Sequence, residues 1–593
     1  MAKGKKKKLK LETVTFKKCR KIKREDGLVM QTVEGYTFPL FLKAITSRYR
    51  NRTCYRVFRT GEENDLTYRQ LSWEAYAVST YLLNHGIEKG DRVIVLGESC
   101  PNWMVMYLGI TCIGAVAVPV LPDFSSSEIR NIIKASAPKG ICVNVRQYQK
   151  LKGLDLSGKL LFRMEDLVHV TDLDQYSFAE APGFSAAHQK IELKKVTQVE
   201  VKEDDIASLI FTSGTTGSSK GVLLTHKNLI RNADISAVIY VKIKPGMRSL
   251  SILPMSHVYE FTLGQVLMLM LGMEITFLGK PPATSILMAA LAEVRPHAML
   301  SVPLLIEKVY RSAVVPALEQ ESVKKLLKYP LTRRVVYHTI GKKLMNSFGH
   351  CLLFFGIGGA AVDDEVVHFL HKAHFPYATG YGLTETSPLI AGCGSAHRRQ
   401  RPGFVGEVHP DADIILLDKN GEGVGEVAVK GPSVMQGYFD NPELNEASFT
   451  SDGYFRTGDL GYIDERGCLA IKGRVKTMIL GPGGENIYPE PIENMINANE
   501  YVEESLVIPD KGGLVALIKI DLELMSQKMK ISVQEAKVEA QKYVKRIKTD
   551  VNSELSAFSK LSDAELQEEA FERTPTQKIK RFLYERKQGE KGK

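Results

Sequence analysis

The stretch Leu209-Ile-Phe-Thr-Ser-Gly-Thr-Thr-Gly-Ser-Ser-Lys-Gly221 combines an apolar start with glycines, hydroxyl side chains and one lysine. Its apolar start is typical of a buried strand, and a helix is expected soon after it, from Lys227. Glycines let a backbone approach an anion closely, while the hydroxyls and the Lys220 ammonium supply hydrogen-bond donors and positive charge. The stretch therefore predicts a loop that binds phosphate oxygens.

Two other interpretations of this loop are weaker. A polar surface turn is also rich in Gly, Ser and Thr, but it rarely collects several closely spaced glycines and a lysine. A Walker-type phosphate loop has the pattern G-x-x-x-x-G-K-[ST]. Here Lys220 follows Ser219 rather than glycine and precedes Gly221 rather than Ser or Thr. The sequence thus favours a phosphate loop of another class.

A second motif, Gly380-Tyr-Gly-Leu-Thr-Glu-Thr386, lies downstream of this loop. Tyr381 offers a flat face for an adenine ring, and Thr384 offers a hydroxyl to an α-phosphate. Glu385 is a carboxylate able to hold Mg²⁺, which prefers oxygen ligands beside phosphates. Each residue alone would more simply be a core or surface residue, but their combination favours a nucleotide site.

The pattern T-S-G-T-T-G-x-x-K-G, from Thr212 to Gly221, resembles the signature of the adenylate-forming superfamily. That superfamily includes acyl-CoA synthetases, firefly-type luciferases and the adenylation domains of peptide synthetases. The other motifs of the family follow in order, so the resemblance extends over residues 40–582, approximately. It implies an enzyme that uses ATP and Mg²⁺ to form an acyl-adenylate, whose acyl group then passes to coenzyme A.

The resemblance also implies a role for individual residues of the motifs. The residues expected to bind ATP and AMP are Thr212, Ser213, Gly214, Thr215, Thr216, Gly217, Lys220, Gly358, Gly359, Ala360, Gly380, Tyr381, Gly382, Thr384, Asp459, Arg474 and Lys578. The catalytic residues expected are Lys220, Thr384, Glu385 and Lys578, and Glu385 is also the expected Mg²⁺ ligand. The acyl pocket is assigned to His257, Tyr259 and Gly358, the interdomain hinge to Lys476, and the coenzyme A tunnel to Gly483 and Gly484.

Two downstream motifs contribute an acid and a lysine to this set. Asp459 ends the run Tyr-Phe-Arg-Thr-Gly-Asp, and a carboxylate with two oxygens is suited to accept both ribose hydroxyls. Lys578 belongs to Thr574-Pro-Thr-Gln-Lys-Ile-Lys-Arg581, where the family usually has glycine in place of Gln577. Because of this departure, Lys580 stays open as the alternative adenylation lysine.

Short apolar strands alternate with helix-length segments before about residue 405, as in Arg92–Leu96, Asn102–Gly114 and Ala115–Val120. This pattern predicts parallel sheets covered by helices on both faces. Beyond that point, dense turn signals predict short hairpins, and the last ~115 residues predict a small α+β unit. Its expected strands and helices are Glu504–Ile508, Val515–Ile520, Val533–Ile547 and Asp563–Phe571, the last two being helices.

The fold class expected is therefore α/β. The resemblance implies a large N-terminal domain of doubly wound sheets with helices plus a distorted β-barrel subdomain, followed by a small mobile α+β domain. The expected limits are a basic tail at residues 1–30, the large domain at 31–474 and the small lid domain at 475–593.

The net charge of +11 lies entirely in residues 1–24, which hold twelve Lys or Arg against the single acid Glu12. The remaining chain is balanced, whereas a nucleic-acid enzyme would more typically spread basic residues over a binding face. The tail is suited to an anionic membrane, but a solubilising tail or a nucleic-acid-binding arm stays equally open. Scattered cysteines and no visible leader segment predict a cytoplasmic protein, with peripheral contact at the inner membrane face left open.

The substrate expected is a medium- to long-chain fatty acid. By resemblance, the form Ser256-His-Val-Tyr-Glu260 and the long N-terminal half are closer to fatty acyl-CoA synthetases than to acetate or aryl ligases. Two alternatives stay open. One is a ligase that passes the acyl group to an acyl carrier protein, and the other is a non-catalytic nucleotide-binding relative.

Overall fold

The computed structural model describes residues 35–61, 65–170, 191–213, 219–237, 243–279, 284–393, 403–480, 486–510, 513–556, 559–573 and 579–585. The predictions that lie outside these ranges concern the tail at residues 1–30 and Gly214, Thr215, Thr216, Gly217, Gly483, Gly484 and Lys578. Within the ranges, no helix combines the length and the apolar character that crossing a membrane requires.

Within the described residues, the larger sheet has thirteen strands. Their order is β17 (Asp413–Leu417), β18 (Gly425–Lys430), β20 (Phe455–Ile463), β21 (Cys468–Arg474), β16 (Gly406–Val408), β15 (Leu389–Gly392), β14 (Tyr377–Gly382), β13 (Phe354–Ile357), β12 (Ala298–Ser301), β10 (Arg248–Ser251), β11 (Glu274–Phe277), β1 (Thr53–Val57) and β2 (Leu66–Thr67). From β14 to β1 the pairs are parallel, whereas β15 and the strands beyond it pair antiparallel. The change of direction falls beside the predicted motif at Gly380–Thr386. The strands expected as a distorted barrel thus continue the larger sheet.

The smaller of the two large sheets has eight strands in the part of the chain that the structure describes. Their order is β19 (Gly437–Tyr438), β9 (Ser219–Thr225), β8 (Ile206–Ser213), β4 (Val116–Val120), β3 (Arg92–Leu96), β5 (Gly140–Val143), β6 (Leu160–Arg163) and β7 (His169–Val170). The five strands from β8 to β6 run parallel, and β9, β19 and β7 are antiparallel additions.

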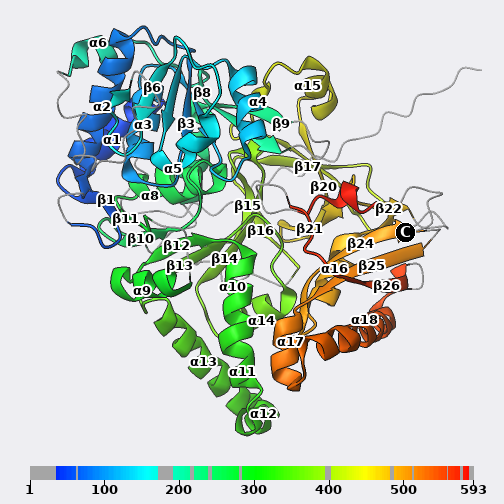
Figure 1. The fold of residues 1–593 in the computed structure, drawn as a ribbon. Coiled ribbons are helices and arrows are strands. Elements are labelled where there is room, and N and C mark those ends of the chain that lie inside the picture. The colour runs from blue at the N-terminus through cyan, green and yellow to red at the C-terminus, as the bar shows by residue number, and fades with distance from the viewer. Residues whose placement is uncertain are drawn as a thin grey trace, which may run out of the picture.

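A continuous core joins these two sheets through the helices between them (Figure 1). Its helices are α1 (Phe38–Tyr49), α2 (Tyr68–Asn84), α3 (Pro101–Thr111), α7 (His226–Ser236) and α8 (Leu267–Met270). Every residue of α3 is buried, as expected for a helix packed on all sides. The outer faces are covered by α9 (Thr284–Val294), α13 (Pro330–Ser347) and α14 (Asp364–Lys372) on the larger sheet, and by α4 (Ser126–Ser136) and α5 (Val145–Tyr148) on the smaller. The predicted α/β class is confirmed.

Shorter helices connect these layers. They are α6 (Leu193–Thr197), α10 (Pro303–Val309), α11 (Val315–Leu318), α12 (Glu321–Leu327) and α15 (Pro442–Ser448), the π-helical turns η7 (Glu260–Val266) and η8 (Tyr310–Val314), and the 3₁₀ turns η3 (Gln149–Leu151), η9 (Thr384–Thr386) and η11 (Arg581–Leu583). The run α10 to α13 extends away from the sheets and ends in a corner at α12 (Figure 1).

The C-terminal unit has a separate core. Its elements are β22 (Ile479–Leu480), β23 (Asn486–Ile487), α16 (Pro489–Asn497), β24 (Val502–Asp510), β25 (Gly513–Ile520), α17 (Leu522–Met529), α18 (Val533–Glu554) and β26 (Leu561–Gln567). The two predicted strands and the long helix from Val533 are present, with longer bounds. The predicted domain limits at residues 30 and 474 stay predictions.

The helix predicted at Asp563–Phe571 is wrong, because strand β26 covers most of this segment. Leu561 and Ala564 are buried three residues apart, a spacing that also occurs on a helix. β26 pairs in parallel with β25, with Ala516 opposite Ala564. Pairing at a sheet edge thus overrides the local preference of an acidic segment that resembles a helix.

Candidate nucleotide and acyl site

The predicted phosphate loop joins two antiparallel strands, because β9 intervenes before helix α7. The apolar residues that follow the loop form β9, a strand that the sequence did not predict. In this hairpin Thr212 lies opposite Lys220, and Ser213 lies opposite Ser219. The tip, residues 214–218, lies outside the described residues. The hairpin therefore places Lys220 at the base of the loop.

Lys220 lies beside two side chains from distant segments. Its ammonium nitrogen is 5.3 Å from the centre of the Tyr438 ring. The Tyr438 hydroxyl in turn donates to Oε1 of Glu385 at 2.9 Å. Burial and the neighbouring Lys476 charge lower the pKa of Lys220, while the Glu385 carboxylate acts in the opposite direction. The residues predicted as loop lysine, hinge lysine and metal ligand therefore lie close together: Lys220, Lys476 and Glu385. Tyr438, which was not predicted, lies beside them.

Asp459 is bound between two other predicted residues. It is buried on β20, where the Tyr381 hydroxyl donates to its Oδ2 atom at 2.7 Å. Nε of Arg474 lies 2.9 Å from the Oδ1 atom, because β20 and β21 pair with Asp459 opposite Arg474. Burial and the Asp459 charge raise the pKa of Tyr381 far above its ordinary value, so its hydroxyl stays a donor. This carboxylate has the two oxygens that a ribose diol requires.

The turn between Tyr381 and Glu385 requires glycine at position 382. A Cβ atom at Gly382 would stand 1.8 Å from the carbonyl oxygen of Pro388, so any side chain would displace the backbone. Gly380 is similarly confined by Leu389. The 3₁₀ turn η9 follows at once and carries Thr384 and Glu385. The backbone amide of Met435 bonds to the Glu385 carbonyl at 2.8 Å and fixes this turn against the segment before β19.

The structure thus links five predicted residues and Tyr438 into one site. Contacts run from Lys220 through Tyr438 to Glu385, and from Tyr381 through Asp459 to Arg474. The two runs lie close together for two reasons. Tyr381 and Glu385 flank one turn, and Lys476, two residues after Arg474, is near enough to Lys220 to lower its pKa. One side of the site carries two ammonium groups and the other a diol acceptor, an arrangement suited to a nucleoside polyphosphate.

Glu385 fits the predicted role of Mg²⁺ ligand. Its Oε1 atom accepts the Tyr438 hydroxyl, and no described residue donates a hydrogen bond to Oε2. In the described ranges, no cluster of three or more His, Cys, Asp or Glu side chains is arranged to hold a metal ion. Mg²⁺ is usually bound by one or two carboxylates together with substrate phosphates, so a single half-buried carboxylate beside Lys220 is sufficient.

Of the predicted acyl-side residues, Gly358 directly follows β13, whereas His257 and Tyr259 lie between β10 and η7. A Cβ atom at Gly358 would stand 2.9 Å from the Tyr259 ring, so the two residues form one wall. His257 lies in the same segment, and its Nδ1 atom accepts the Tyr259 amide at 3.4 Å. The predicted Gly359 and Ala360 are exposed beside this wall.

Two exposed apolar residues near this wall were missed by sequence reasoning. Val302 directly follows β12 and Leu304 lies in the first turn of α10, just after Ser301, whose carbonyl oxygen accepts the Gly358 amide at 3.2 Å. Their signal is their position after a parallel strand, where ligand-binding residues of α/β folds gather. Tyr438 had no comparable signal, since its role depends on the pairing of β19 with β9.

Glu260 adds a titratable group behind Tyr259. The carboxyl is buried, and its Oε1 atom accepts the Ser251 hydroxyl at 2.6 Å and the Gln265 amide at 2.8 Å. The π-helical turn η7 brings Gly264 against it, where a Cβ atom would lie 2.5 Å from the carboxyl carbon. Burial raises the pKa of Glu260 to about 7.

We expect Glu260→Gln to stabilise the protein at alkaline pH but not at acidic pH. Because the folded pKa lies above the unfolded value, the wild type loses stability as pH rises toward about 7. Glutamine keeps the Oε1 acceptor and removes the charge. The advantage of the variant in unfolding free energy should therefore grow by about 3 kcal/mol from acidic to alkaline pH, measured by denaturant titration. Parallel stability curves would contradict this.

The residues around the predicted adenylation lysine are partly described. Lys578 itself lies outside the described residues, as do Gly483 and Gly484. The alternative, Lys580, has its ammonium nitrogen 3.5 Å from Glu572. Arg581 forms an ion pair with Glu493 and so attaches the end of the chain to α16.

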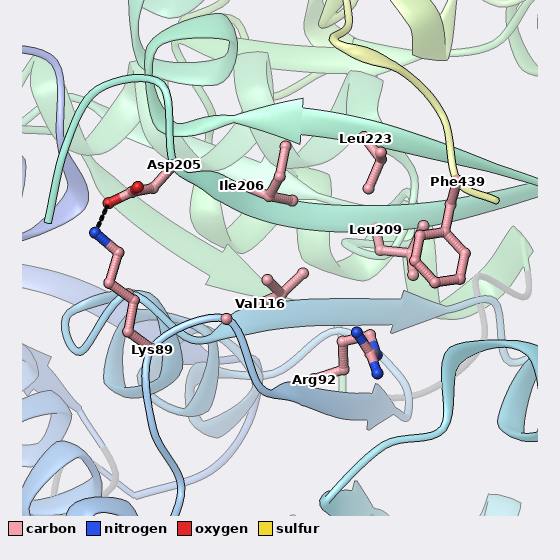
Figure 2. Close-up of a pocket in the computed structure, with 10 residues that line it drawn as sticks. Lys89, Arg92, Val116, Asp205, Ile206, Leu209, Leu223 and Phe439 are labelled. Carbon is pink, nitrogen blue, oxygen red and sulfur yellow. Dashed lines mark ion pairs between the residues drawn. The ribbon is translucent and has the colours of Figure 1, made fainter. Parts of the chain in front are cut away.

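A separate hollow of about 300 Å³ lies on the outer face of the eight-stranded sheet (Figure 2). It is lined by Lys89, Gly90, Arg92, Gly114, Val116, Asp205, Ile206, Leu209, Leu223 and Phe439. None of the described predicted site residues lines it. Lys89 and Asp205 pair at 2.5 Å across one end, so their charges neutralise one another. The hollow is therefore distinct from the nucleotide site.

Comparisons with known proteins show the family to which the chain belongs. The family model described as AMP-binding enzyme matches residues 42–439. The chain is 28% identical over 522 residues to the long-chain-fatty-acid–CoA ligase heimdall of Drosophila melanogaster, covering 80% of this chain and 74% of the relative. It is 28% identical over 475 residues to a long-chain-fatty-acid–CoA ligase of Bacillus subtilis, covering 75% and 79%.

Solved structures show the same fold. ATP-bound MatB from Rhodopseudomonas palustris superposes with a TM-score of 0.72 at 21% identity, covering 92% of this chain and 98% of that chain. A fatty acyl CoA synthetase of Mycobacterium tuberculosis superposes with a TM-score of 0.61 at 22% identity, covering 93% and 97%. The prediction of the superfamily from the motifs is confirmed, and the chain belongs to the family of AMP-binding enzymes.

Proposed function

We propose that this protein is an acid–thiol ligase that activates a medium- to long-chain fatty acid with ATP and transfers the acyl group to coenzyme A. The observation that supports this most is the shared neighbourhood of Lys220, Glu385 and Lys476 next to the Tyr381–Asp459–Arg474 group. A polyphosphate and a ribose of one nucleotide can occupy these two halves together.

In the first step, a carboxylate oxygen of the fatty acid attacks the α-phosphorus of ATP. The bond from that phosphorus to the bridging oxygen breaks, and pyrophosphate leaves with the electron pair. Lys220 and the hydroxyl of Thr384 would offset the charge that builds on the phosphate oxygens, while Asp459 holds the ribose. Mg²⁺ on Glu385 would supply further positive charge beside the phosphates.

In the second step, the thiol of coenzyme A attacks the acyl carbon, and AMP leaves with the oxygen it received. The small domain is proposed to turn about Lys476 between the steps, so that the segment of Gly483 and Gly484 replaces Lys578 at the site. One pocket then serves both half-reactions, and the closed domain protects the reactive anhydride from water.

The fatty acid is supported by two observations of different kind. Relatives of this chain are named long-chain-fatty-acid–CoA ligases. Tyr259 also packs against Gly358, and the exposed apolar Val302 and Leu304 lie just after β12, the strand that pairs with β13. An apolar wall beside a phosphate site suits a substrate with a carboxylate head and a hydrocarbon chain.

Carboxylate-dependent exchange of labelled pyrophosphate into ATP tests the first step. A panel of acids from short to long chains should show the highest exchange with medium or long chains. Exchange with none of the acids would favour a non-catalytic nucleotide-binding relative. Coenzyme A should then support acyl transfer, and product only with acyl carrier protein would favour the alternative ligase.

We expect Asp459→Ala to raise KM for ATP about ten- to a hundredfold, with a smaller change in kcat. The substitution removes the proposed ribose acceptor and leaves Tyr381 and Arg474 without their shared partner. Steady-state kinetics at saturating fatty acid measure the effect. Asp452→Ala is the control, because that aspartate is exposed before β20 and should leave KM unchanged. Equal KM values for both variants would contradict the ribose assignment.

We propose in addition that the basic segment at residues 1–24 contacts anionic membranes, where fatty acids partition. Its twelve basic residues and one acid are suited to an anionic surface, to which each cation contributes about 1 kcal/mol. Sedimentation with anionic vesicles of the full chain and of a chain without residues 1–24 tests this. Equal sedimentation would favour a solubilising tail, and binding to nucleic acid alone would favour the nucleic-acid-binding arm.

A further inference from the structure

The corner between α12 and α13 exposes large apolar side chains. Leu331 is 84% exposed, Tyr329 66%, Val335 65% and Leu326 44%. In Figure 1 this corner is the end of the projection formed by α10 to α13, well away from the two sheets. Exposure of several large apolar side chains within ten residues of chain marks an interaction site rather than ordinary surface.

The corner is held in place by packing of the other face of α13 and by hydrogen bonds between the two helices. The exposed side chains therefore do not result from loose packing. Val336, Ile340 and Leu344 bury the opposite face of α13, at the spacing of one helical stripe. The Thr332 hydroxyl donates to the carbonyl oxygens of Leu326 and Tyr329 and ties the two helices together. The apolar side chains at the corner are therefore held outward by the fold.

Positive charge surrounds the exposed apolar residues. Residues 319–334 contain Lys324, Lys325, Lys328, Arg333 and Arg334 against Glu319 and Glu321. Lys324 pairs with Glu321 at 3.3 Å. Among the residues that the structure describes, no carboxylate lies within ion-pair distance of Lys325, Lys328, Arg333 or Arg334, and all four are exposed. The corner therefore combines exposed apolar side chains with exposed cations that no described carboxylate neutralises.

We propose that the α12–α13 corner is a membrane-docking surface for an anionic bilayer. Leu326, Tyr329, Leu331 and Val335 would enter the boundary between head groups and acyl chains, while the cations around them meet lipid phosphates and carboxylates. The aromatic ring and hydroxyl of Tyr329 suit the same boundary.

A bilayer fits this corner better than a protein partner does. Specific protein interfaces bury about 800 Å² on each side, with a packed apolar centre and a polar rim. Here a few side chains occupy the end of a projection rather than a broad face or groove (Figure 1). A fluid anionic surface needs no complementary shape and accepts any arrangement of cations around an apolar tip.

Docking here is separate from the proposed basic segment at residues 1–24 and from the chemistry of the nucleotide site. It would bring a fatty acid-activating enzyme to the phase in which long-chain acids dissolve, and to that extent it extends the proposed function. Its test needs no ATP, coenzyme A or fatty acid, so it can fail or succeed independently of the ligase assignment.

Vesicle flotation of the full-length protein tests the surface. Vesicles of phosphatidylcholine containing phosphatidylglycerol should bind the wild type, and Tyr329→Ser with Leu331→Ser should weaken binding by about tenfold. Arg333→Glu with Arg334→Glu should weaken it by at least about tenfold and lower its salt dependence. All variants should keep the wild-type rate on a water-soluble medium-chain acid.

Matched controls use the far end of the molecule. Trp73→Ser with Leu193→Ser removes two exposed apolar residues from α2 and α6, and Arg130→Glu with Lys134→Glu reverses two exposed cations on α4. Both controls should bind vesicles as the wild type does. If they weaken binding as much as the corner variants do, the corner has no specific role and the proposal is overturned.

A fluorescence measurement separates this surface from residues 1–24. Tyr329→Trp should gain emission that shifts to the blue and is quenched by brominated phospholipids in the same vesicles. The parent protein provides the baseline, since its exposed Trp73 lies on α2, away from the corner (Figure 1). Vesicle binding without quenching at position 329 would place the contact elsewhere. Lipid-independent oligomers that the Tyr329→Ser, Leu331→Ser variant abolishes would instead identify a self-association surface; both outcomes overturn the proposal.

Discussion

Glu385→Gln is expected to slow acyl-adenylate formation by about 10²–10³-fold while leaving the fold intact. Glutamine keeps an oxygen that can accept the Tyr438 hydroxyl, so the hydrogen bond at 2.9 Å survives. The variant loses the negative charge that would hold Mg²⁺ against the ATP phosphates. Pyrophosphate release in a single turnover, at saturating ATP and fatty acid, measures the change, and a raised Mg²⁺ concentration should partly restore the rate.

Tyr438→Phe is the control that separates charge from positioning. It removes the hydroxyl that orients Glu385 but keeps the carboxylate and the ring beside Lys220. The loss should be about tenfold, the size expected for one hydrogen bond to a charged group. If Glu385→Gln retained the wild-type rate and the same response to Mg²⁺, Glu385 would not be the metal ligand.

Most residues proposed for the nucleotide site, Tyr438 excepted, were predictable because they lie in short contiguous motifs. The glycines and hydroxyls after Leu209 indicate a phosphate loop through local chemistry alone. Strands such as Arg92–Leu96 coincide with the structure because a continuous apolar run is sufficient to predict a strand buried on both faces. Gly382 also has a local signal, and the structure supplies its reason in the carbonyl of Pro388.

The contacts between motifs were not predictable. Tyr381 and Asp459 are 78 residues apart, and Glu385 and Tyr438 are 53 residues apart. The position of Asp459 depends on the register of β20 on β21, and that of Tyr438 on the register of β19 on β9. No periodicity within these segments fixes either register. Tyr438 was missed for this reason. The false helix at Asp563–Phe571 has the same origin, since only pairing with β25 makes that segment a strand.

The exposed α12–α13 corner had no sequence signal either. The order Leu331-Thr-Arg-Arg-Val-Val336 is one that a helix with a buried stripe also allows. Only the packing of α13 decides that Val336 is buried while Val335, one residue before it, is exposed. Sequence patterns predict that a helix has an apolar face, but they do not say which apolar residues remain outside that face.

Lys578→Ala is expected to abolish adenylation, with a loss of at least about 10²–10³-fold, and to leave thioester formation from supplied acyl-adenylate largely intact. The proposed role of Lys578 is to offset charge on the phosphate oxygens only in the first half-reaction, before the small domain turns. Its sequence position supports this, because it lies three residues before Arg581, which is attached to Glu493 on α16 and would move with that domain.

Lys580→Ala is the matched control for this prediction. The Lys580 ammonium lies 3.5 Å from Glu572, so its charge is already neutralised within the small domain. Its removal should therefore leave both half-reactions within about threefold of the wild type, as expected for a partly exposed ion pair.

Pyrophosphate exchange reports the first half-reaction, and thioester formation from synthetic acyl-adenylate and coenzyme A reports the second. The two lysines lie two residues apart in one motif. A loss of the first half-reaction in Lys578→Ala but not in Lys580→Ala would therefore assign the adenylation role to Lys578. Selective loss in Lys580→Ala would transfer that role, and equal loss of both half-reactions in Lys578→Ala would argue against a lysine that acts only before the domain turns.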